Sequence, residues 1–169
     1  MKYIFSVLIL TTITSFGQVS KVAYSDGTQQ LEGYFAKAKK ANPKKIGVIV
    51  LPAWMGVDNN AKESAEALAK LGYHAFVADI YGVGNNPKNT SEAGKNAGFY
   101  KNNPAEYQKR IKLAIDQLVK AGADKNEIAV IGYCFGGTGA IEAARGNLNV
   151  KAVVSFHGGL AKAENSPTE

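Results

Sequence analysis

The stretch Gly132-Tyr133-Cys134-Phe135-Gly136 decides the fold, because it places a cysteine between two glycines in a tight turn. A short apolar run, residues 128–131, precedes the turn, and a small-residue segment of helical character, residues 137–144, follows it. Strand, glycine-flanked turn and helix in this order are typical of a nucleophile elbow. Glycine is needed two residues either side of the nucleophile, because larger side chains would collide in so sharp a turn.

Cys134 is therefore the candidate nucleophile. The turn directs its thiol towards the N-terminus of the following helix, where unpaired N–H groups favour the thiolate. A free thiol is mostly protonated at neutral pH, so a nucleophilic cysteine needs this help. The alternative is a buried structural cysteine beside a glycine turn. The strand before and the helix after favour the nucleophile.

Apolar patterning along the rest of the chain predicts one α/β domain over residues 18–169. An antiparallel pair around Asp26-Gly27 comes first, and strands then alternate with helices, which predicts a doubly wound, mostly parallel sheet. The predicted strands are residues 22–25, 31–36, 46–51, 73–80, 128–131 and 151–156. One predicted helix carries Ala61, Ala65, Leu68 and Ala69 and ends at Gly72, another runs from Pro104 to Gly122, and the elbow helix ends near Gly146.

The segment 82–103 is polar and rich in glycine and asparagine, and it is longer than a structural connection needs. It is therefore predicted to be a loop that covers a site. The helix after it is predicted to begin with Asn103 as cap, Pro104 at its first position and Glu106 closing a capping box.

Residues 1–17 are predicted to be a signal peptide rather than part of the core. Lys2 precedes an apolar run over residues 3–13, and Ser15-Phe16-Gly17 supplies small residues before a cut ahead of Gln18. The run is too short and too rich in threonine for a comfortable membrane span, so no stable span is expected after its removal. The expected location of the mature protein is periplasmic or secreted.

The formal net charge of +6 does not by itself indicate a nucleic-acid partner. A lysine cluster surrounds Pro43, but no arginine or aromatic residue interleaves with it, so a solvated turn between two strands is predicted. The cluster consists of Lys37, Lys39, Lys40, Lys44 and Lys45.

Cofactor and metal sites are not predicted. The chain has 1 cysteine and 2 histidines, which excludes an internal disulfide and argues against a zinc site. Gly82-Val83-Gly84 does not continue into a helix bearing a third glycine, and residues 136–140 lack the Lys-Ser/Thr of a phosphate loop.

Four segments resemble the dienelactone hydrolase family of α/β-hydrolases, and the resemblance runs from about residue 31 to the end. They are Pro52-Ala53-Trp54-Met55-Gly56, Ala78-Asp79-Ile80-Tyr81-Gly82, Gly132-Tyr133-Cys134-Phe135-Gly136-Gly137 and Val154-Ser155-Phe156-His157-Gly158. The resemblance implies a sheet of the α/β-hydrolase type and a thiol that attacks an ester or lactone carbonyl. It makes Cys134 the nucleophile and the N–H groups of Trp54 and Phe135 the oxyanion hole.

The chain also departs from the family's pattern. Ala53 replaces a glutamate that engages the resting thiol in dienelactone-cleaving members, and no arginine lies between the signal and Arg110 to receive a substrate carboxylate. The family's acid and base follow two further strands, and a complete domain of this kind needs about 200–250 residues. The chain is therefore expected to be C-terminally incomplete, with the last strands and helices absent.

Three residues of the chain are considered as the catalytic acid or base. Asp79 lies at the carboxyl edge of the sheet, where active sites are found, but a loop-fixing or capping role is favoured over catalysis. His74 is excluded because it starts a strand, whereas active sites in parallel sheets lie at the carboxyl ends, and it is predicted to be a surface or rim residue. His157 follows the last strand at the correct edge, either as a pocket-lining residue or as general base.

The leading hypothesis is an exported carboxylic-ester or lactone hydrolase with a small-molecule substrate. The alternative is a non-catalytic α/β-hydrolase-like protein that binds small acyl ligands. A redox-active thiol protein is disfavoured because the chain has no resolving cysteine. Retention of cysteine at the elbow supports catalysis, and the missing acid and base support the alternative.

Overall fold

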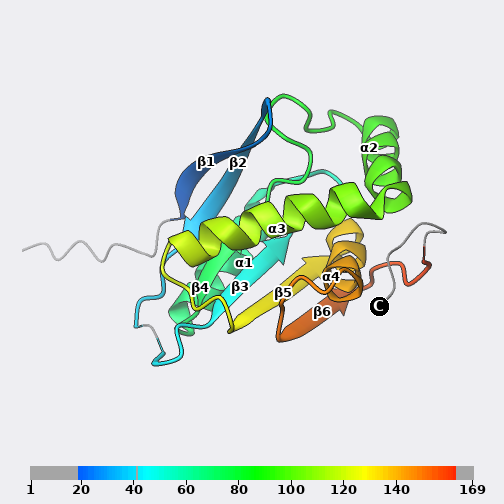
Figure 1. Ribbon diagram of the computed structural model, residues 1–169. Helices are drawn as coiled ribbons and strands as arrows, with labels where there is room; N and C mark the ends of the chain where they lie inside the picture. Colours follow the sequence, from blue (N-terminus) through cyan, green and yellow to red (C-terminus); the bar gives the residue numbers. More distant parts are fainter. Residues whose placement is uncertain (1–18, 41, 163–169) are drawn as a thin grey trace, which may run out of the picture.

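The computed structural model describes residues 19–40 and 42–162 (Figure 1). The predicted signal peptide lies outside these residues. Six strands form one sheet in the order β1-β2-β4-β3-β5-β6. The strands are β1 (Ser20–Asp26), β2 (Gln29–Ala36), β3 (Gly47–Leu51), β4 (His74–Val77), β5 (Ile128–Tyr133) and β6 (Ala152–Phe156), and the helices are α1 (Asn59–Lys70), α2 (Thr90–Asn102), α3 (Pro104–Lys120) and α4 (Phe135–Arg145).

The sheet is mixed, with a parallel part that holds the elbow. β4, β3, β5 and β6 run parallel to one another, whereas the β1–β2 hairpin adds to β4 in the antiparallel sense. All 5 residues of β3 are buried, as its continuous apolar sequence predicts. This arrangement confirms the doubly wound, mostly parallel sheet.

Helices cover both faces of the sheet (Figure 1). On one face, α1 buries Ala61, Ala65 and Ala69 against strand residues such as Val50 and Val77. Alanines at i, i+4 and i+8 place only small side chains on this stripe, so the helix approaches the sheet closely. On the other face, α3 and α4 pack beside each other over the larger of the two apolar clusters. The lysine cluster lies in the connection between β2 and β3.

The segment predicted as a covering loop contains a helix, α2, so that prediction was wrong in part. Asn89 caps it, because its side-chain oxygen accepts a hydrogen bond from the Glu92 amide at 2.9 Å. Ala93, Ala97 and Tyr100 recur at helical spacing and are buried. This apolar stripe is short and made mostly of alanine, so the polar composition around it conceals the helical period.

Two further boundaries differ from prediction. α3 begins at Pro104 as expected, but Asn103 makes no side-chain cap bond, because its amide donates instead to the Phe99 carbonyl at 2.7 Å. β4 ends at Val77 rather than at residue 80, because Asp79 accepts hydrogen bonds that fix the following loop.

Among the described helices, none combines the length and apolarity needed to cross a bilayer.

Candidate active site

Cys134 occupies the sharp turn between β5 and α4. Its backbone torsions, φ 56° and ψ −114°, lie in a region that side-chain-bearing residues rarely adopt. The Cys134 amide donates to the Phe156 carbonyl at 2.9 Å, which ties the strained residue to the end of β6. A strained, non-glycine residue between a strand and a helix is the conformation expected of a nucleophile elbow.

The flanking glycines are required by close backbone contacts. A Cβ atom on Gly132 would collide with the backbone of Gly136, and one on Gly136 would collide with the Leu51 carbonyl group. The turn is therefore closed against its own helix on one side and against the end of β3 on the other. This packing is the physical reason for the G-x-C-x-G pattern.

The two backbone amides predicted to form the oxyanion hole are those of Trp54 and Phe135. Phe135 is the first residue of α4, so its N–H has no partner within the helix. Trp54 follows β3, the strand beside β5, in a turn closed by a 3.0 Å hydrogen bond from the Gly56 amide to the Ala53 carbonyl. Within the described residues, neither the Trp54 nor the Phe135 amide donates a hydrogen bond, so both remain available.

An aromatic cluster packs beneath this edge. The Phe135 ring stacks with the Tyr107 ring at 4.7 Å between centroids and with the Tyr81 ring at 5.5 Å. The Tyr81 hydroxyl donates to the Trp54 carbonyl at 2.9 Å. The sequence predicts no role for Tyr81, because this contact joins residues 27 positions apart in the chain.

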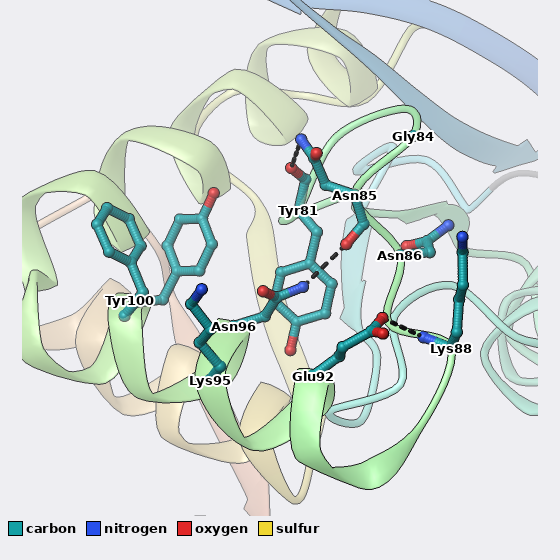
Figure 2. A pocket seen from close by; sticks show the side chains of 10 residues that line it. Tyr81, Gly84, Asn85, Asn86, Lys88, Glu92, Lys95, Asn96 and Tyr100 are labelled. Carbon is teal, nitrogen blue, oxygen red and sulfur yellow. Dashed lines mark hydrogen bonds between the residues drawn. The ribbon is translucent and has the colours of Figure 1, made fainter.

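A cavity of about 420 Å³ lies between the segment after β4 and α2 (Figure 2). The predicted covering segment therefore does line a cavity, although 13 of its residues form α2. The Asn96 side-chain amide donates to the Asn85 carbonyl at 2.9 Å and holds the loop against the helix. The lining side chains include amides, two lysines, one carboxylate and aromatic faces: Tyr81, Asn85, Asn86, Lys88, Glu92, Lys95, Asn96, Phe99 and Tyr100.

Asp79 fixes the loop at the end of β4. One carboxylate oxygen accepts from the Glu32 amide at 2.9 Å and the other from the Gly82 amide at 2.8 Å. Burial raises the pKa of Asp79, although both amide hydrogen bonds act to lower it. Its two oxygens are occupied by structural hydrogen bonds, which favours the loop-fixing role over catalysis.

The two histidines have different environments. His74 starts β4 at the end of the sheet opposite Cys134, which agrees with the predicted rim position, but it is 7% exposed and so is not the surface side chain of the other alternative. It is buried because its Nδ1 accepts from the Ala38 amide and its ring stacks on Phe35. His157 is exposed and directly follows Phe156, whose carbonyl binds the Cys134 amide.

The described residues do not join a base to the thiol by a hydrogen bond, and they contain no group of three or more metal-ligating side chains. Positive charge at the cavity comes from lysines. Arg110 instead pairs with Asp26, with 3.1 Å between Nε and a carboxylate oxygen, and Arg145 pairs with Glu142 at 2.8 Å.

Comparison with known families agrees with this geometry. The family model described as "Dienelactone hydrolase family" matches residues 31–169. The chain belongs to this family. The matched range includes the elbow, the Trp54 loop and the segment that lines the cavity.

Individual proteins are also similar to this chain. The solved structure named m3DLH is 32% identical, with a TM-score of 0.81 over 88% of this chain and 62% of that one. A dienelactone hydrolase-like promiscuous phosphotriesterase from metagenomic libraries is 35% identical, with a TM-score of 0.76 over 85% of this chain and 60% of that one. A Yersinia pestis protein named "Putative carboxymethylenebutenolidase" is 28% identical over 138 residues, which are 78% of this chain and 50% of that protein. The chain thus spans about half the length of the curated relatives that it matches.

Proposed function

We propose that the protein is a carboxylic-ester or lactone hydrolase that uses Cys134 as its nucleophile. The observation that carries the proposal is the conformation of Cys134, held at positive φ between Gly132 and Gly136 at the N-terminus of α4. Membership of the dienelactone hydrolase family supports ester and lactone chemistry in general. The cysteine nucleophile is a proposal from the site itself.

In the proposed reaction, the Cys134 thiolate attacks the carbonyl carbon and a C–S bond forms. The carbonyl electron pair moves to oxygen, and the amides of Trp54 and Phe135 donate to the resulting oxyanion. Collapse of this intermediate breaks the C–O bond and expels the alcohol part of the substrate, which takes up a proton from solvent. Water then attacks the thioester, and cleavage of the C–S bond releases the acid, the thiolate and one proton, which returns to solvent. For a lactone, both products remain one molecule.

The cavity lined by Tyr81 is the proposed place for the part of the substrate away from the reacting carbonyl, because Cys134 does not line it, whereas Tyr81 contacts both Trp54 and Phe135. Its volume of about 420 Å³ falls within the usual range for small-molecule pockets, ~300–1,000 Å³. Asparagine amides, Lys88 and Lys95 offer hydrogen bonds to polar substituents, while the aromatic faces of Tyr81 and Tyr100 offer apolar contact. A small ester or lactone with polar substituents fits this lining.

A second candidate is a protein that binds small acyl ligands without turning them over. It is favoured by one observation: among the described residues, no base is hydrogen-bonded to the Cys134 thiol. Without a base, acylation by an activated ester is still feasible, but deacylation loses the ~10²–10⁴-fold that general acid–base catalysis contributes. The two candidates therefore differ in turnover rather than in the first step.

The test is an assay with p-nitrophenyl acetate on residues 18–169 and, separately, on any longer natural form. We expect the short chain to release at most one equivalent of p-nitrophenolate in a burst and the longer form to turn over. Cys134→Ala should abolish both signals. Steady turnover by the short chain, lost in Cys134→Ala, would instead make His157 the general base. A burst that survives in Cys134→Ala would contradict the nucleophile assignment.

Export is a separate proposal that rests on residues 1–17 alone. Mass spectrometry of the mature N-terminus is the direct measurement, with Gln18 expected as the first residue. Intact Met1 on protein recovered from the cytoplasm would contradict both the cleavage and the periplasmic or secreted location.

A further inference from the structure

We infer that Tyr81 is a positioning residue that holds the two oxyanion amides in place. The inference rests on the proposed function, because it concerns the amides of Trp54 and Phe135 as donors to an oxyanion. Tyr81 is 4% exposed and contacts both residues, one through its hydroxyl and the other through its ring.

The hydroxyl acts on the Trp54 side of the site. Two peptide groups flank the α-carbon of Trp54, and each has its carbonyl engaged. The Ala53 carbonyl accepts from the Gly56 amide at 3.0 Å, and the Trp54 carbonyl accepts from the Tyr81 hydroxyl at 2.9 Å. In a planar trans peptide the N–H points opposite to the carbonyl. The Trp54 N–H shares its peptide with the Ala53 carbonyl, so the Gly56 bond sets its direction. The Tyr81 bond holds the peptide on the other side of the Trp54 α-carbon and so limits rotation of the turn that carries this N–H.

The ring acts on the Phe135 side. The Tyr81 and Phe135 rings lie 5.5 Å apart between centroids and are inclined by only 21°. Phe135 is also stacked on Tyr107, whose hydroxyl donates to the Phe135 carbonyl at 3.0 Å. Tyr107 thus supports the elbow helix from within the core, whereas Tyr81 bridges the elbow helix to the Trp54 loop.

Tyr81 is itself rigidly placed and remains a donor. Its carbonyl accepts from the Asn85 side-chain amide at 3.1 Å, and the next amide, that of Gly82, is held by Asp79. Burial, followed by the charges of Tyr100 and Cys134, raises the pKa of the Tyr81 phenol. The hydroxyl therefore keeps its proton for the Trp54 carbonyl throughout the neutral and mildly alkaline range.

The test compares two reactions of the same thiol in the wild-type chain and in Tyr81→Phe. Acetylation by p-nitrophenyl acetate passes through an oxyanion, whereas alkylation by iodoacetamide displaces iodide and forms none. We expect Tyr81→Phe to slow acetylation by about tenfold, the scale of one lost hydrogen bond and below the ~10²–10³-fold cost of deleting an oxyanion donor itself. The rate of alkylation should be unchanged.

Tyr73→Phe is the matched control, since Tyr73 lies just before β4 at the opposite edge of the sheet, and it should change neither rate. If both rates fall together in Tyr81→Phe, Tyr81 supports only the fold and the inference is wrong. If the wild type shows the burst and Tyr81→Phe shows it at the same rate, the inference is also wrong. A wild-type chain that alkylates but shows no Cys134-dependent burst contradicts the proposed function and, with it, this inference.

Discussion

β5 and β6 are neighbouring parallel strands, yet they are packed very differently. β5 lies between β3 and β6, and Ile128 and Val130 are fully buried. β6 pairs only with β5, and within the described residues no strand covers its other edge. Val154 is 43% exposed and Phe156 is 45% exposed, the latter stacked only on Tyr133 at the end of β5.

This difference in packing separates the proposed nucleophile and oxyanion amides from the candidate base, His157. The nucleophile and the oxyanion amides are carried by β3, β5 and α4, whose contacts with one another close the elbow. His157 and the residues after β6 stand beside an open edge. The proposed nucleophile and oxyanion amides are therefore held by packed contacts within the described residues, whereas His157 follows a strand that has one unpaired edge there.

The elbow glycines provide the largest expected effect. Gly136→Ala should lower the free energy of unfolding by about 3 kcal/mol or more, because its Cβ would meet the backbone of Leu51, which cannot rotate away. Denaturant melts measure the change. Gly98→Ala on α2 is the matched control: nothing lies within 4 Å of the added atom, so a gain of about 0.5–1 kcal/mol is expected. Equal losses at both positions would contradict the close-contact argument.

The contrast between the strands can be measured with one side chain. Val130→Ala in β5 should cost about 2–3 kcal/mol of unfolding free energy, because it leaves a cavity in a fully buried site. Val154→Ala in β6 should cost less than about 0.5 kcal/mol, since the side chain is half exposed. If the two losses are similar in denaturant melts, β6 is covered in solution, for example by self-association through its open edge.

Asp79 tests how the loop beside Tyr81 is held. Asp79→Asn keeps the shape but replaces one acceptor oxygen by a donor, so either the Glu32 or the Gly82 amide loses its partner. An unpaired buried amide should cost about 1–3 kcal/mol in the free energy of unfolding. Asp116→Asn, at an exposed position on α3, is the control and should have little effect. A neutral Asp79→Asn variant would mean that these two hydrogen bonds are not needed.

The smallest expected effect is a pH dependence from His74, away from the site. Burial, followed by the charges of Lys37 and Lys45, lowers the pKa of His74 in the folded protein. The unfolded chain therefore binds a proton first as the pH falls, so stability is complete above about pH 6.5 and declines below it. Denaturation midpoints at pH 7.5 and 5.5 should differ more in the wild type than in His74→Gln. Equal differences would show that His74 does not titrate with folding.

Much of the framework was predictable because it depends on local patterns. Each pattern that predicted correctly lies within a single element or turn: the apolar runs of β3 and β5, the alanine spacing of α1 and the glycines around Cys134. α2 escaped prediction, since its buried stripe is three residues in a polar segment. The burial of His74 also escaped, because Phe35 and Ala38, which cover it, come from a different strand and its connection.

The sequence by itself determined the elbow, since a cysteine flanked by glycines between an apolar strand and a helix has few other conformations open to it. Only the tertiary structure decided what surrounds that cysteine. Tyr81 reaches Trp54 across 27 positions, and the Tyr107 hydroxyl reaches Phe135 across 28. Such contacts depend on how strands and helices pack rather than on neighbouring residues, so no local pattern of the sequence records them.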